Sequence, residues 1–215
     1  MRRIRKGSEP RQLAERRMTP GTRTSWGAPK AETDEWREAL HREQLGLCAY
    51  CMGRLRLDEA RIEHHEPRSS ARDRTYDWSN MLGVCQGQLP DGTVFCEAAR
   101  GDGELHANPT RFPPDVGDLF RYTPAGVMQS ANGDAQIEAT ISRLRLNAEH
   151  LKRNRSAVIV RCRERLQNTD GDVARVRREW ERPQPDGQLL PYVEVALQYL
   201  DKKARARGVS RGPRG

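Results

Sequence analysis

Two pairs of cysteines constrain this chain more than any other feature of its sequence. Cys48 and Cys51 form a C-x2-C knuckle, and Cys85 and Cys96 form a second, wider pair. Four thiolates in two pairs are a ligand set that suits tetrahedral zinc. Residues 48–101 are rich in turns and poor in apolar runs, so a metal ion would stabilise a segment with little core of its own. The sequence therefore predicts a structural zinc site, and a closed site of this kind leaves no position at which zinc could activate water.

Nothing in the sequence predicts export or insertion into a membrane. The N-terminal stretch MRRIRKGSEPRQ lacks the apolar region of a secretory signal, and no apolar run approaches the ~20 residues that span a bilayer. We therefore expect a cytoplasmic protein with no membrane partner, whose cysteines stay reduced. The fifth cysteine, Cys162, lies on the apolar face of a helical pattern and is predicted to belong to the core.

The charge balance of the chain is basic. The formal net charge is +8, and most of the excess is arginine, whose planar guanidinium suits phosphate groups. Such an excess favours a polyanionic partner such as nucleic acid, and an ordinary basic surface is the alternative. Because 35% of the residues are hydrophobic and 32% are charged, we expect a modest core and a surface that packs against another protein.

The apolar periodicity predicts the secondary structure. The first thirty residues carry few periodic apolar positions, so we expect an extended arm with little regular structure. A helix capped by Thr33 or Asp34 and ended by Gly46 should lead into Cys48. Short strands are expected near 119–122 and 126–129, and helices are expected between 137 and 166, over 172–182 and over 190–208.

A cluster of ionisable residues lies between the two cysteine pairs. In the stretch RIEHHEP, Glu63, His64 and His65 stand side by side and are followed by Pro67. A histidine can act as a base near neutral pH, and a carboxylate beside it can hold a hard divalent ion. Hydrolysis of a phosphodiester needs both functions, an activated water and a cation on the phosphate. The alternative is a solvated bend without chemistry.

The order of these motifs resembles a known family. The chain reads C-x2-C, then E-H-x-x-P, then S-N-x-L-x-x-C, then C-E-x-x-R-G-D. This order resembles HNH endonucleases of the ββα-metal type, and in particular the retron- and Septu-associated, PtuB-like nucleases of anti-phage defence. The stretches MRRIRKGSEPRQL, GLCAYCMGRL and ATISRLRLNAEHLKRNRSAVI also resemble that family, so the resemblance covers most of the chain except the last thirty or so residues.

The resemblance implies an α+β fold. A small ββα-metal core with a structural zinc ion would be flanked by α-helices. We expect a basic N-terminal arm over 1–32, the HNH core over 33–110, and a mainly helical region over 111–215 that docks a partner.

The resemblance also assigns roles within the central motif. Glu63 would be a ligand of a catalytic Mg2+ or Mn2+ ion, and His64 would be the general base, because the base of the family stands three residues before the proline, here Pro67. The other register, with His65 as the base and His64 as a ligand, stays open. Otherwise His65 would contact phosphate or pack as a ring. Asn80 would pin the motif loop by hydrogen bonds to the backbone.

Two positions of the last motif depart from the commoner family pattern. The family more often has Asp and Lys where this chain has Glu97 and Arg100. Glu97 would be the second ligand of the catalytic ion and Arg100 would hold the phosphate. Asp102 is the alternative ligand, and an exposed acid at a helix start is the alternative interpretation of Glu97.

A basic surface is expected around this site. With His65, we expect the arginines of the motif loop, Arg68, Arg72 and Arg74, to contact nucleic acid. A solvated loop is the alternative.

By resemblance, the function would be metal-dependent cleavage of nucleic acid, either DNA or tRNA. The family acts in anti-phage defence with an ABC or SMC-like (PtuA-like) ATPase, and in a retron also with a reverse transcriptase and its RNA–DNA product. Two alternatives stay open. One is a catalytically degenerate, zinc-binding adaptor that links the ATPase to nucleic acid, and the other is a homing or restriction type HNH enzyme that works alone.

Overall fold

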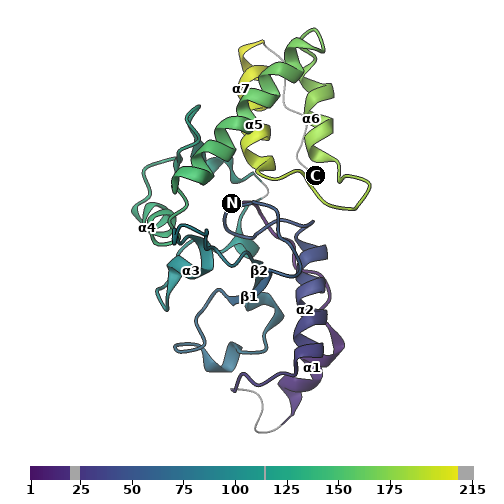
Figure 1. The fold of residues 1–215 in the computed structure, drawn as a ribbon, viewed down its shortest axis with the longest axis vertical. Coiled ribbons are helices and arrows are strands. Elements are labelled where there is room, and N and C mark those ends of the chain that lie inside the picture. The colour runs from purple at the N-terminus through teal and green to yellow at the C-terminus, as the bar shows by residue number, and fades with distance from the viewer. Residues whose placement is uncertain (20–24, 114, 208–215) are drawn as a thin grey trace.

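The computed structural model describes residues 1–19, 25–113 and 115–207, and Figure 1 shows the arrangement of the elements. Seven α-helices lie in this part of the chain. They are α1 Arg11–Met18, α2 Lys30–Glu43, α3 Cys96–Arg100, α4 Ala135–Arg143, α5 Glu149–Gln167, α6 Val173–Glu181 and α7 Val193–Ala206. The strands are β1 Arg61–His64, β2 Met81–Val84, β3 Phe120–Tyr122 and β4 Met128–Ser130, and they form two antiparallel pairs. The protein is therefore α+β, as expected.

The motif histidines lie at the end of a hairpin. Strand β1 pairs with β2 so that Glu63 faces Leu82 and His64 faces Met81 across the ladder. Helix α2 packs along this hairpin and ends before Gly46, whose φ of +72° is a conformation that glycine adopts without strain. The chain then turns directly into the first cysteine pair.

The N-terminal region is not an extended arm over its described residues. Residues 11–18 form helix α1, and Leu13 is fully buried against Trp36 and Leu40 of α2. The prediction of little regular structure was therefore wrong for this stretch, because a single well-packed leucine supports the helix and no periodic pattern is needed. Residues 20–24 of the predicted arm lie outside the described residues.

Helix α2 begins earlier than its sequence signals indicated. Its first residue is Lys30, which follows Pro29, and neither Thr33 nor Asp34 caps it. The Thr33 hydroxyl instead donates to the carbonyl of Lys30 within the first turn. The proline fixes its own φ angle close to the helical value, which favours a helix start at this point.

The C-terminal half has the predicted elements. The strand pair β3–β4 and the four helices α4 to α7 fall close to their expected positions. Helices α5, α6 and α7 gather at one end of the molecule, away from α1, α2 and the β1–β2 hairpin (Figure 1). Cys162 is fully buried among Val176, Trp180 and Leu200 of these helices, so its assignment to the core is confirmed. Residue 114 and the tail 208–215 lie outside the described residues.

One hydrophobic cluster joins the N-terminal, cysteine-containing and C-terminal regions of the chain. It contains Ile4 from the N-terminal segment, Cys48 from the knuckle, Phe120 of β3, Ile159 of α5 and Val195 of α7. The segment with the cysteines therefore shares its core with the C-terminal helices. In the part of the chain that is described, no helix combines the length and the apolar character that a membrane span requires.

Candidate metal centre and catalytic site

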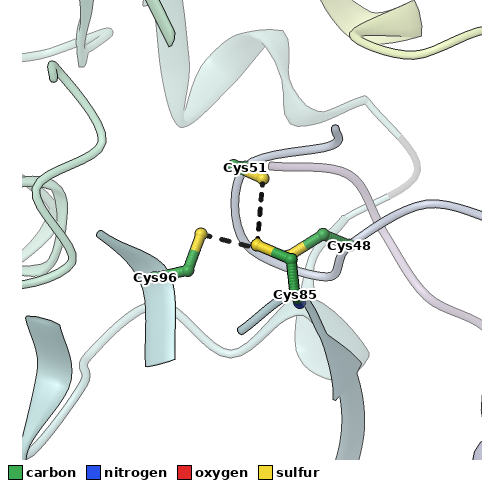
Figure 2. Close-up of side chains that lie close together, drawn as sticks. All are labelled: Cys48, Cys51, Cys85 and Cys96. Atoms are coloured by element: carbon green, nitrogen blue, oxygen red, sulfur yellow. Dashed lines mark hydrogen bonds between the residues drawn. The ribbon is translucent and has the colours of Figure 1, made fainter. Parts of the chain in front are cut away.

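The four cysteines converge on one point, as Figure 2 shows. Their sulfur atoms all lie within 4.8 Å of one another. The Sγ atoms of Cys48 and Cys96 are 4.0 Å apart, and those of Cys51 and Cys85 are 3.9 Å apart. A zinc ion with bonds of about 2.3 Å to four sulfur atoms would separate these atoms by about 3.8 Å. The cluster therefore fits a tetrahedral zinc site.

Separate elements bring the cysteines together. The knuckle is closed by backbone hydrogen bonds from Cys48 to Gly53 and from Met52 to Cys48, of 2.9 and 3.0 Å. Cys85 follows the last residue of β2, and its amide donates to the sulfur of Cys48 at 3.4 Å. Cys96 begins helix α3, and its amide donates to the carbonyl of Leu144 at 2.9 Å.

The chemistry of the four thiols also favours a cation. Burial opposes ionisation of Cys48, but hydrogen bonds from the other three thiols outweigh it and hold the pKa of Cys48 well below its usual range. Burial, followed by the hydrogen bond with Cys48, raises the pKa of Cys96 well above that range. Ionisation of the first thiol, Cys48, is therefore favoured, and ionisation of a second thiol, such as Cys96, is opposed. A divalent ion would remove this conflict, because it lets all four cysteines bind as thiolates.

Asn80 fixes the loop that follows β1. Its side-chain oxygen accepts from the amide of Glu66 at 2.8 Å, and its side-chain nitrogen donates to the carbonyls of Glu66 and Arg74 at 3.1 and 3.4 Å. Asn80 is almost fully buried, so these bonds are shielded from water. They tie both ends of the motif loop to the start of β2.

The ring of His64 is anchored at one nitrogen. Its Nε2 atom lies 2.8 Å from the carbonyl oxygen of Thr75 and donates to it in the neutral ring. Its Nδ1 atom then carries the lone pair and is the atom that can accept a proton. Burial lowers the pKa of His64 to about 4, and the hydrogen bond to Thr75 opposes this shift. The ring is therefore neutral at pH 7, the state that a general base requires.

The ring of His65 is held on another side of the loop. Its Nε2 atom lies 3.3 Å from the carbonyl oxygen of Ala107, and its buried Nδ1 atom has no hydrogen-bond partner. Burial, followed by the charge of Arg100, lowers the pKa of His65 to about 4. His65 lines a cavity of about 820 Å³ together with Asp102 and Arg111. A contact of His65 with nucleic acid stays a prediction.

Glu63 and Arg100 form a buried ion pair between β1 and α3. The side chains are 13% and 4% exposed. Arg100 also donates to the carbonyl oxygen of His64 at 2.6 Å and to that of His65, and the phenol of Tyr50 donates to Glu63 at 3.3 Å. Burial raises the pKa of Glu63, and the charge of Arg100 opposes this shift. Arg100 thus holds the end of β1 here, and its contact with phosphate stays a prediction.

The expected second ligand lies near the first. Glu97 stands in the first turn of α3, is partly exposed, and its charge contributes to the raised pKa of Glu63. Within the described residues, the four cysteines are the one group of three or more candidate ligands close enough to share an ion. The binding of a catalytic ion by Glu63 and Glu97 stays a prediction. Asp102 lines the cavity beside His65 and stays the alternative ligand.

The arginines of the motif loop divide into two kinds. Arg68 and Arg72 are exposed, and the guanidinium of Arg68 lies 5.2 Å from the ring centre of Trp26. Arg74 is engaged within the protein, where it pairs with Glu66 and Asp77. The first two are free to meet a phosphate backbone. The ion pairs of Arg74 stabilise the loop, and contacts of all three arginines with nucleic acid stay predictions.

Three contacts of this site have no motif in the sequence. The carbonyl of Thr75 orients His64, the phenol of Tyr50 reaches Glu63, and Trp26 packs against His64. A backbone carbonyl carries no residue signal, and Trp26 lies far from the motif in the chain. Tyr50 stands inside the knuckle CAYC, and that position was the one available hint.

Comparison with known proteins gives one informative relative. No family model matches the chain. A protein of Vibrio cholerae serotype O1 biovar El Tor, named "Retron Vc95 putative HNH endonuclease", is 29% identical over 133 residues. The alignment covers 58% of this chain and 63% of the relative, which is less than two thirds of its length. This partial similarity supports an HNH endonuclease family for the chain, with a four-cysteine cluster that fits zinc.

Proposed function

We propose that this protein is a metal-dependent HNH endonuclease that hydrolyses phosphodiester bonds of nucleic acid. The observation that carries the proposal is the anchoring of His64 at the end of β1. Thr75 binds its Nε2 atom and leaves Nδ1 as the acceptor, and Asn80 holds the loop on which the ring is mounted. The similarity to a retron-associated protein named as an HNH endonuclease supports the same chemistry.

The ββα-metal arrangement would consist of β1, β2 and α3. The hairpin carries Glu63 and His64, and α3 carries Glu97 and Arg100. Glu63 and Glu97 would hold the catalytic Mg2+ or Mn2+ ion, which supplies positive charge at the scissile phosphate. The four cysteines would hold zinc as a structural staple between the hairpin and α3.

The protein's own residues then have defined tasks. Nδ1 of His64 takes a proton from the attacking water, the water oxygen bonds to phosphorus, and the bond to the leaving oxygen breaks. The leaving oxygen takes a proton from solvent. Exposed Arg68 and Arg72 attract the phosphate backbone from the open side of the loop. Arg100 holds the carbonyls of His64 and His65 and so keeps the end of β1 in place.

We extend the proposal to a role in defence against phage. The name of the relative refers to a retron, and the motif order resembles nucleases that act beside an ABC or SMC-like ATPase. The C-terminal helices carry exposed basic and apolar side chains, such as Arg153, Arg161 and Val160, and would dock this partner. A reverse transcriptase and its RNA–DNA product would be further partners in a retron.

The test is a cleavage assay on the full chain, with and without an ABC or SMC-like ATPase as the proposed partner. Zinc-loaded protein is incubated with plasmid DNA or total tRNA in Mg2+, in Mn2+, or without divalent ion. His64→Ala and His65→Ala serve as a matched pair, because the two rings are adjacent and similarly buried. We expect divalent-dependent cleavage that His64→Ala abolishes and His65→Ala retains in part. Loss of activity in His65→Ala alone would reverse the register of the motif.

One observation favours a second function, a zinc-binding adaptor that does not cut. Glu63 is occupied by Arg100 and Tyr50, and a metal ion would have to share its carboxylate with Arg100. An adaptor would bind nucleic acid and the ATPase while wild type and His64→Ala stay equally inert in every ion tested. Zinc content and thermal unfolding show whether an inert protein is folded.

A further inference from the structure

A tryptophan from the N-terminal region lies against the candidate general base. The rings of Trp26 and His64 meet edge to face, with centres 5.1 Å apart and planes at 88°. His64 is only 6% exposed as a result of this and neighbouring contacts. None of the stretches that resemble the family contains Trp26, and the sequence predicts that this residue belongs to a basic arm.

Trp26 is itself firmly held. Its ring stacks on Tyr76 with centres 5.6 Å apart and planes at 18°, and the ring centre of Trp36 of helix α2 lies 5.9 Å from its own, with planes at 62°. The hydroxyl of Tyr76 donates to the carbonyl of Ser25 at 2.8 Å and accepts from the amide of Gly27 at 3.2 Å. Tyr76 therefore forms hydrogen bonds with the backbone on both sides of Trp26, and these bonds hold the indole beside the imidazole.

The hydrogen bond to Thr75 restrains one motion of His64 only weakly. The imidazole turns about its Cβ–Cγ bond, and Nε2 lies closer to that axis than Nδ1 does, so a moderate turn moves Nε2 little. Such a turn would swing Nδ1 away from a bound water without breaking the bond. A ring packed edge to face on the imidazole blocks the turn, because it fixes the plane of the ring. Catalytic groups need this second restraint, since their orientation must hold within about 10–20°.

We infer that Trp26 is a positioning residue, which sets the plane of the His64 imidazole so that Nδ1 faces the reacting water. The inference rests on the proposed function of His64 as general base. It assigns Trp26, with Tyr76 and the carbonyl of Thr75, to the restraint of the imidazole and not to the binding of substrate. The opposite interpretation is that Trp26 covers Nδ1 and must leave before the enzyme can act. The two interpretations predict opposite effects of removing the indole.

Steady-state cleavage by Trp26→Ala, Trp26→Phe and Trp36→Phe tests the inference. Without the indole, kcat should fall by up to about a hundredfold, as for other misplaced catalytic groups. KM should rise much less, because the indole supports only Arg68 of the two proposed phosphate contacts and leaves Arg72 in place. Trp26→Phe keeps an aromatic ring in contact and should restore most of the rate. Trp36→Phe loosens the same aromatic cluster but not the ring on His64, so it controls for general packing. Each variant must retain its zinc and a cooperative thermal transition.

Nuclear magnetic resonance gives a readout that a purely structural role would not change. Long-range correlations between ring protons and 15N identify the protonated nitrogen of each histidine, and His64→Ala assigns the signal. In wild type, the His64 ring should carry its proton on Nε2, and in Trp26→Ala the signal should broaden or shift toward the other tautomer. If Trp26→Ala cleaves faster than wild type, the inference is wrong and Trp26 instead blocks Nδ1 of His64. If kcat and the spectrum are both unchanged, Trp26 has no role in the orientation of His64. If wild type does not cleave at all, the proposed function fails first, and the spectrum still shows whether Trp26 fixes the ring.

Discussion

The adjacent residues His64 and His65 make stability depend on pH. Burial lowers the pKa of each to about 4, whereas an unfolded histidine titrates near 6.5. Between these values the unfolded chain binds more protons than the folded chain, so the free energy of unfolding falls as the pH falls. The contribution of each ring is fully present above pH 6.5 and is lost as the pH drops through this window toward 4.

We therefore predict that His65→Gln has a shallower stability profile than wild type. Between pH 7 and pH 5, the wild-type protein should lose about 2 kcal/mol more unfolding free energy than the variant, because the unfolded variant lacks one histidine that would take up a proton in this range. Urea unfolding at the two pH values, with zinc in excess, measures the difference. Acid release of zinc affects both proteins alike, so parallel profiles would contradict the prediction.

Removal of one partner of the Arg100–Glu63 ion pair should lower the unfolding free energy more than replacement of both partners by uncharged residues. Arg100→Met leaves the carboxylate of Glu63 buried without its partner and removes the donor to the carbonyls of His64 and His65. We expect a loss of about 3–5 kcal/mol in unfolding free energy. Glu63→Gln combined with Arg100→Met should cost clearly less than the sum of the single changes, since no charge is then left unpaired. Urea unfolding of all four proteins closes the cycle, and additive effects would show that the pair is not coupled.

At the scale of elements, the sequence predicted the helices that have a periodic apolar pattern and the metal site that has a recognisable set of ligands. Helices α4 to α7 were predicted from apolar spacing. The cage, which we define as the cluster of Cys48, Cys51, Cys85 and Cys96, was predicted from the two cysteine pairs. Helix α1 was missed because a single buried residue, Leu13, docks it, and α3 has too few residues for a periodic pattern. The contacts of Trp26 and of the Thr75 carbonyl with His64 were missed because they depend on how distant segments meet.

The loop between β2 and α3 depends on one glycine. Gly87 has a φ of +72°, and a Cβ atom there would lie 1.9 Å from the carbonyl oxygen of Phe95, whose amide donates to Gly87. Gly87→Ala should therefore displace Phe95 and with it the neighbouring ligand Cys96, which lowers the zinc content of purified protein. Gly92 lies in the same loop with a φ of +82° and open space around its Cβ position. Gly92→Ala should cost only about 1 kcal/mol and keep a full zinc content. Equal zinc in both variants would show that the loop can adjust.

Across the whole molecule, the cage is connected to the C-terminal helices. The amide of Tyr192, which precedes α7, donates to the carbonyl of Met52 in the knuckle at 2.9 Å. The amide of Leu189 donates to the carbonyl of Leu45 at the same distance. The amide of Cys96 binds the carbonyl of Leu144 after α4. Because of these bonds and the shared hydrophobic cluster, we expect the cage and the helices to unfold as one cooperative unit.

This connection predicts how the protein responds to loss of zinc. A chelator, or Cys48→Ser, should lower the Tm of a single unfolding transition by at least about 10 °C, because a structural zinc site contributes several kcal/mol and each one shifts the Tm of a chain this size by about 2–4 °C. Calorimetry and the helical circular dichroism signal should move together. Cys162→Ser is the control, since this buried cysteine lies outside the cage, and its smaller Tm loss should not depend on zinc. Two separate transitions, with the helical one unchanged by the chelator, would show instead that α5, α6 and α7 fold independently of the metal centre.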